Sequence, residues 1–150
     1  MFRITRAEEQ AIRLIMRLAT ENRQQTLGEL AESEGLPEPT VAKLLGFLRR
    51  GGVVDAVRGR NGGYVLAGPP ASISAAQVLG CINGESAFSY PCNDQMEADC
   101  PRNQDCGLRP VWHHLESRVV AVLEQTSIAD LLKNEDTASA DVQQLWPGAE

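Results

Sequence analysis

Apolar residues recur at helical spacing along the first third of the chain. Residues 11–19 carry them at every third or fourth position, which predicts a helix over residues 8–22. Thr26 and Glu29 have the spacing of a capping box and predict the start of a second, short helix. A third helix is expected to end at Arg50, before two glycines. Two short helices around a tight turn, after a supporting helix, are typical of a helix-turn-helix.

The pattern then changes to that of a β-hairpin. Residues 53–58 and 63–66 are expected to form strands, and the intervening Gly-Arg-Asn-Gly favours a tight turn. The three helices alone would also suit an ordinary helical bundle, but a hairpin directly after a helix-turn-helix is typical of a wing. The sequence therefore predicts a mainly α fold with a small β-hairpin wing, a winged helix-turn-helix domain over residues 1–67.

A longer helix is predicted in the C-terminal half, from Pro110 to about Gln125. One apolar stripe runs along it and consists of Val111, Leu115, Val119, Val122 and Leu123. Proteins that bind DNA as two-fold symmetric dimers need such an element to set the spacing of their half-sites, so we expect a homodimer. Residues 68–133 would hold a cysteine-containing loop and this dimerisation helix, and residues 134–150 a flexible tail.

Two shorter helices flank these segments. Ser74 and Gln77 form a further capping box, whose helix is expected to end near Gly80. Cys81 would follow the helix end as a small buried hydrophobic residue. Thr126 or Ser127 is expected to cap a last helix that reaches Leu132.

The charge of the chain is unevenly distributed. The net charge is −6, but residues 1–67 hold ten Lys and Arg against eight Asp and Glu, whereas residues 68–150 hold four against twelve. A mildly basic half suits a protein that meets a phosphate backbone with one end, although surface charge can also simply be uneven. No segment approaches the roughly 20 apolar residues of a membrane span, so we expect a cytoplasmic protein without a membrane partner.

The expected DNA contacts come from the third helix and the wing. The N-terminal part of a recognition helix usually faces the bases, and the arginines would meet phosphates of a double-stranded operator. A solvated hairpin tip is the alternative interpretation of the wing arginines. The predicted base-facing residues are Glu38, Thr40 and Lys43, and the other predicted contacts are Arg49, Arg50, Arg58, Arg60 and Asn61.

Three cysteines carry the main chemical signal. Seven residues separate Cys92 from Cys100, and five separate Cys100 from Cys106. Zinc sites usually use cysteine pairs spaced by about two to four residues, whereas wider spacing suits the separate iron corners of a cluster. Zinc, a thiol switch, an electron-transfer site or no function stay open as alternatives. No Ser/His/Asp set, phosphate loop or catalytic carboxylate pair stands out, so an enzyme is not expected.

The chain from about residue 4 to 134 resembles the Rrf2 family of bacterial winged-helix regulators, with its IscR-like and NsrR-like branches. The resemblance is carried by Ile15-Met16-Arg17-Leu18-Ala19, by the wing motif Val57-Arg58-Gly59-Arg60-Asn61-Gly62-Gly63-Tyr64-Val65-Leu66-Ala67, by the cysteine loop leading into Leu108-Arg109-Pro110-Val111-Trp112, and by Ser127-Ile128-Ala129-Asp130-Leu131-Leu132. The wing motif and the three cysteines are fairly specific together, and either alone would be weak.

The resemblance implies an iron–sulfur cluster held by Cys92, Cys100 and Cys106, whose state controls DNA affinity in response to redox, nitric oxide or iron status. A four-iron cluster ([4Fe–4S]) is favoured and a two-iron cluster is the alternative. The spacing of the first two cysteines is wider than is common in the family, and Arg109 stands where IscR-like members have a histidine.

The run Cys106-Gly107-Leu108-Arg109 resembles the NsrR-like branch more closely. In that branch the fourth ligand can be a carboxylate from the first helix of the partner subunit. Glu9 aligns with that position, and Glu8 is adjacent to it. Acidic residues are also favoured at a helix N-terminus for electrostatic reasons alone. His113, His114 and Cys81 are the alternative fourth ligands.

Overall fold

The computed structural model describes residues 4–84, 100 and 105–133, and it begins with three helices. These are α1 (Arg6–Glu21), α2 (Leu27–Glu34) and α3 (Glu38–Arg50). The second and third agree with the predicted helix-turn-helix. The first begins earlier than predicted, because Thr5 and Glu8 form a capping box that satisfies backbone N–H groups at its start.

The predicted hairpin is present as β1 (Val54–Val57) and β2 (Gly63–Leu66), two antiparallel strands that pair Val54 with Leu66. Gln25, in the turn between α1 and α2, forms an isolated antiparallel bridge with Tyr64 of β2. The carbonyl of Gln25 accepts from the N–H of Tyr64 at 2.7 Å, and the N–H of Gln25 donates to the carbonyl of Tyr64 at 3.0 Å. The wing is therefore attached to the helix-turn-helix along its returning strand.

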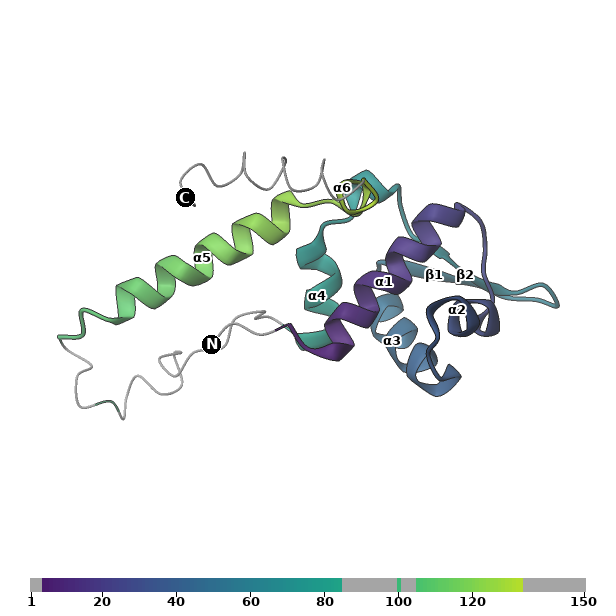
Figure 1. Cartoon of the computed structure of the whole chain (residues 1–150), viewed down its shortest axis with the longest axis horizontal. Helices are drawn as coiled ribbons and strands as arrows, with labels where there is room; N and C mark the ends of the chain where they lie inside the picture. The colour runs from purple at the N-terminus through teal and green to yellow at the C-terminus, as the bar shows by residue number, and fades with distance from the viewer. Residues whose placement is uncertain (1–3, 85–99, 101–104, 134–150) are drawn as a thin grey trace.

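The C-terminal half contributes the turn η1 (Pro70–Ser72) and the helices α4 (Ala75–Asn83), α5 (Arg109–Gln125) and α6 (Ile128–Leu131). The prediction that the helix after Ser74 ends near Gly80 is wrong, because the helix continues to Asn83 and Gly84 follows at its end. α5 projects away from the winged domain, and α6 returns to it (Figure 1).

One hydrophobic core joins the two halves of the chain. Its fully buried residues come from α1, α2, α3 and β1, and Val78 of α4 and Ile128 of α6 belong to the same cluster. Backbone hydrogen bonds hold α6 in place. The N–H of Ile128 donates to the carbonyl of Ile73 at 2.8 Å, and the N–H of Ala75 donates to the carbonyl of Thr126 at 2.8 Å. Within the described ranges, no helix combines the length and apolar character needed to cross a bilayer.

Candidate functional site

The recognition helix α3 presents a charged face and a buried face. Val41, Leu44, Leu45 and Leu48 pack into the core, while Lys43, Arg49 and Arg50 are exposed. Of the other predicted contacts on this helix, Glu38 is exposed at its first position and Thr40 is half-buried.

An aromatic residue that the sequence analysis did not select lies on this helix. Phe47 is half-buried, and its ring centroid lies 5.9 Å from Lys43 Nζ and 4.8 Å from Arg50 Cζ. Cations within about 6 Å of a ring centroid are attracted to the ring face. The signal in the sequence was the spacing itself, a lysine four residues before and an arginine three residues after the aromatic residue, which places all three on neighbouring positions of a helix.

The wing exposes Arg58, Arg60 and Asn61, three residues that the sequence predicts to contact DNA. Gln24 holds this tip, because its amide donates to the carbonyl of Asn61. Gly62 and Gly63 of the wing motif are required by close backbone approach, whereas Gly59 is required by its positive φ of 126°. A Cβ at Gly63 would lie 2.5 Å from the carbonyl oxygen of Gln25.

Two arginines of α1 fix the position of α2. Arg13 Nε donates to Glu34 Oε2 at 2.9 Å, and Arg17 Nε donates to Glu34 Oε1 at 3.1 Å. The hydrogen bond to Glu34 is also the main reason that the pKa of Arg13 is raised. Glu34 is only 8% exposed, so this carboxylate is shielded while its partners reach solvent. The pairs link the supporting helix to the helix-turn-helix.

The two acidic residues near the start of α1 lie in different environments. Glu8 is 2% exposed and accepts hydrogen bonds from the backbone N–H of Thr5 and the side-chain amide of Asn83. Glu9 is 52% exposed, and its carboxylate lies 3.5 Å from Arg13 Nη1. Glu8 therefore has a structural role between α1 and α4, whereas the carboxylate of Glu9 is open to solvent.

The cysteine segment is described only in part. Cys92 lies outside the described residues, while Cys100 and Cys106 are half-buried. In the described part of the chain, no three His, Cys, Asp or Glu residues come together in a group that could hold a metal ion. His113 and His114 are exposed on α5, and His114 Nε2 lies 3.4 Å from Arg118 Nε.

Cys81 lies inside α4 rather than after it. Its thiol donates to the carbonyl of Gln77 at 3.1 Å, and burial raises its pKa. It contacts the end of the recognition helix so closely that a Cβ at Gly51 would lie 2.1 Å from its sulfur. These surroundings fit the expected role of Cys81 as a small packed residue better than the role of a metal ligand. Cys81 is half-buried, however, and not fully buried as expected.

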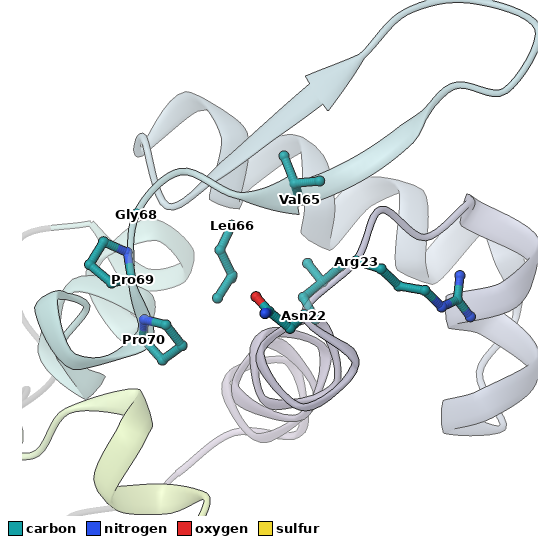
Figure 2. Close-up of a pocket in the computed structure, with 8 residues that line it drawn as sticks. Asn22, Arg23, Val65, Leu66, Gly68, Pro69 and Pro70 are labelled. Atoms are coloured by element: carbon teal, nitrogen blue, oxygen red, sulfur yellow. The ribbon is translucent and has the colours of Figure 1, made fainter.

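A pocket lies between the end of α1, strand β2 and the two prolines that follow the wing (Figure 2). Its cavity volume is about 300 Å³. Leu18, Leu66 and the proline rings supply apolar walls, and Asn22 and Arg23 supply polar groups. None of the residues predicted for metal or DNA contact lines this pocket.

Comparison with known proteins identifies the family. A family model for Rrf2, described as an iron-dependent transcriptional regulator, matches residues 4–134. The chain belongs to the Rrf2 family. The HTH-type transcriptional regulator Rv1287 of Mycobacterium tuberculosis is 35% identical over 132 residues, which cover 86% of this chain and 80% of that protein.

Solved structures agree with this result. One of these structures is that of CymR of B. subtilis, described as the global cysteine regulator. It has a TM-score of 0.70 at 25% identity, and the match covers 88% of this chain and 97% of the CymR chain. IscR of T. potens has a TM-score of 0.68 at 25% identity, and the match covers 92% of this chain and 90% of the IscR chain. The predicted family and winged-helix fold are confirmed, and this Rrf2 chain is a DNA-binding transcriptional regulator, not an enzyme.

Proposed function

We propose that this Rrf2 regulator works as a homodimer in the bacterial cytoplasm and that an iron–sulfur cluster controls its affinity for operator DNA. The observation that carries the proposal is the position of the cysteine segment. Cys106 lies three residues before α5 begins, and the first half of α5 carries the exposed part of the apolar stripe, Val111 and Leu115. A cluster there would adjoin the dimer contact.

DNA binding is assigned to the outer face of α3 and to the wing. Lys43, Arg49 and Arg50 are exposed on the helix, and Arg58 and Arg60 are exposed on the wing. Cations at these positions neutralise phosphates and produce salt-dependent binding, whereas residues early in the helix read base edges. Glu38, Thr40 and Asn61 complete the proposed contact set.

The dimer proposal is supported by the surface of α5. None of its residues is buried. Val111 is 50% exposed and Leu115 39%, and Leu108, just before the helix, is 53% exposed, while the rest of the stripe is half-buried. An apolar stripe of this kind is stabilised by burial against a second copy, at roughly 25 cal/mol for each Å² removed from water. A two-fold contact along α5 would also fix the distance between two recognition helices.

The donor atoms present fit the proposed cluster. Cys92, Cys100 and Cys106 would each bind one iron as thiolates, and Glu9 of the partner subunit would supply the fourth ligand. Glu9 is exposed and Glu8 is engaged in structure, which favours Glu9 of the two. A carboxylate is a harder ligand than a thiolate, so this bond is expected to be the most easily displaced. Three cysteines with a carboxylate favour a four-iron cluster over a two-iron cluster.

Control of DNA binding would follow from a difference in cluster affinity between two arrangements of the dimer. A ligand bond from Glu9 would connect one subunit's cysteine segment to the other's α1. Arg13, which pairs with Glu9, also pairs with Glu34 at the end of α2. A change at Glu9 would therefore reach the helix-turn-helix through one shared arginine.

The first experiment is purification without oxygen, followed by visible absorbance and by measurement of iron and acid-labile sulfide per chain. The proposal expects a brown protein with near-equal iron and sulfide that is bleached by air or nitric oxide. A colourless protein after anaerobic reconstitution would contradict it.

Two pairs of variants test the ligands. Cys106→Ala should abolish the absorbance, whereas Cys81→Ala, the matched control outside the segment, should retain it. Glu9→Ala should make the cluster easier to lose, and Glu21→Ala should not. Glu9 and Glu21 are suitable to compare because each pairs with an arginine four positions away on α1. Equal cluster loss in both glutamate variants would exclude Glu9 as the fourth ligand.

A regulator that senses through zinc or thiol oxidation is the second candidate. It is favoured by the similarity to CymR, which is described as a cysteine regulator. Purified protein that contains zinc or no metal, and whose DNA binding responds to thiol oxidants, would support this alternative. The DNA-binding assignment would be unchanged.

A further inference from the structure

On the outer face of α3, two cationic side chains lie over one aromatic ring. Lys43 Nζ and Arg50 Cζ lie 5.9 Å and 4.8 Å from the centroid of the Phe47 ring. Lysine and arginine precede and follow the phenylalanine by about one helical turn, so their side chains meet on one side of the helix. This side lies away from Leu44 and Leu48, which are buried.

These cations differ from the arginines of α1 and of the turn that follows it. Arg13 and Arg17 both pair with Glu34, and Arg23 pairs with Glu29 at 3.1 Å. Within the described part of the chain, Lys43 and Arg50 form no ion pair with a carboxylate. A ring quadrupole attracts a cation without neutralising it, whereas a carboxylate cancels the charge and occupies its N–H donors.

We infer that Phe47 is a positioning residue for DNA binding, which holds the charged groups of Lys43 and Arg50 ready for the DNA backbone. This inference rests on the proposed contacts of Lys43 and Arg50 with DNA. Free lysine and arginine side chains lose rotamer freedom when they bind a phosphate. A ring that already restricts both chains reduces that loss, and both charges stay available.

The test compares Phe47→Leu with Phe47→Tyr. Leucine keeps an apolar side chain at this half-buried position but has no ring, and tyrosine keeps the ring. Binding of a fluorescently labelled duplex of mixed sequence is measured by anisotropy at several salt concentrations, with the thermal stability of each variant as a check on folding. Absorbance of each sample records its cluster content, so loss of the cluster and loss of cation positioning are distinguishable.

Phe47→Leu should weaken duplex binding about fivefold, since two exposed cation–π contacts are lost. The dependence of affinity on salt should keep its slope, because no charge has been removed. Phe47→Tyr should bind like the unchanged protein. In a chain that also carries Lys43→Gln and Arg50→Gln, Phe47→Leu should have no further effect.

Three results would overturn the inference. One is an unchanged affinity in Phe47→Leu, and another is a similar loss in Phe47→Tyr. The third is a fivefold loss that persists in the Lys43→Gln and Arg50→Gln background, because the ring would then act through packing or by touching DNA itself. If the unchanged protein bound no duplex at any salt concentration, the contact assignment for α3 would fail together with the role of Phe47.

Discussion

The winged domain and α5 use apolar residues in opposite ways. In the winged domain, side chains such as Leu14, Leu30 and Leu45 are fully buried. α5 is longer than any other described helix, yet it has no buried residue, and its stripe includes Leu115 at 39% exposure. The first region is stabilised by its own packing, and the second leaves apolar surface exposed, as the proposed dimer contact requires.

This difference has a consequence for signalling. An element with little packing of its own can change position at low cost, whereas a closely packed domain moves as a unit. Cys106 lies three residues before α5, and the proposed DNA-contacting surface belongs to the packed domain. A signal at the cysteines would thus act first on the part of the molecule that is easiest to move.

The largest expected effect concerns the packed region. Leu45→Ala should lower the free energy of unfolding by about 3 kcal/mol, because it removes buried methyl groups and leaves a cavity. Leu115→Ala should cost less than about 0.5 kcal/mol at protein concentrations where the chain is monomeric. Urea denaturation at several protein concentrations measures both. Equal losses in the two variants at low concentration would show that the two regions do not differ as described.

The second effect concerns the exposed stripe. Leu115→Glu places a charge in the proposed dimer contact, so the protein should become monomeric and bind a two-site operator about a hundredfold more weakly. Ser117→Glu is the matched control, since Ser117 is exposed and lies outside the stripe on the same helix. Analytical ultracentrifugation and anisotropy measure the two properties. A Leu115→Glu protein that remains dimeric would place the dimer contact elsewhere.

A third change tests how tightly the wing is attached. Gly63→Ala would bring a Cβ to within 2.5 Å of a backbone oxygen of Gln25, and we expect a loss of about 2 kcal/mol in unfolding free energy together with weaker DNA binding. Gly80→Ala has open space around it on α4 and should stabilise the protein by up to about 1 kcal/mol. Thermal melts compare the two, and a stable Gly63→Ala protein would mean that the wing shifts without cost.

The smallest effect concerns the return of the chain to the winged domain at α6. Hydrogen bonds from Lys133 and Ser127 hold the pKa of Asp130 well below its usual value. A carboxylate with a lowered folded-state pKa stabilises the fold above its unfolded pKa of about 3.9, and this contribution is lost as the pH falls toward the folded-state pKa. The Asp130 side chain is 36% exposed, so solvent screening keeps the effect below about 1 kcal/mol.

Asp130→Asn should therefore reduce stability slightly at neutral pH and make unfolding less sensitive to acid below about pH 4. Asp55→Asn, at an exposed position of β1, is the control. Identical acid sensitivity in the Asp130→Asn and unchanged proteins would assign the acid response to other carboxylates.

Local signals in the sequence were sufficient for most of the fold. Capping boxes at Thr26 and Ser74, the glycines after Arg50 and the Asn-Gly turn act within a few residues, so the elements they bound could be predicted. Two boundaries were missed. The capping box of Thr5 precedes the apolar pattern of its helix. Gly80 predicts a helix end in the sequence but lies inside α4, since a glycine inside a helix costs only about 1 kcal/mol.

Contacts between distant segments could not be predicted in the same way. The pairing of Glu34 with Arg13 spans 21 residues, and that of Asn83 with Glu8 spans 75. Helical periodicity describes one element at a time and says nothing about which charged groups on different elements meet. For the same reason, the sequence pattern alone does not determine the fourth ligand of the proposed cluster, because that ligand would come from a second chain.

The contact between Gly51 and Cys81 implies an order in which mutations can accumulate. The backbone at Gly51 has φ −78°, which alanine adopts readily, so the main obstacle to the change is the Cys81 sulfur, which would lie 2.1 Å from the added methyl carbon and would have to move. Replacing Cys81 with alanine first removes that sulfur and leaves its Cβ at 3.3 Å. In related lineages, a side chain at the end of the recognition helix should therefore be found only where the facing position of α4 has already become small.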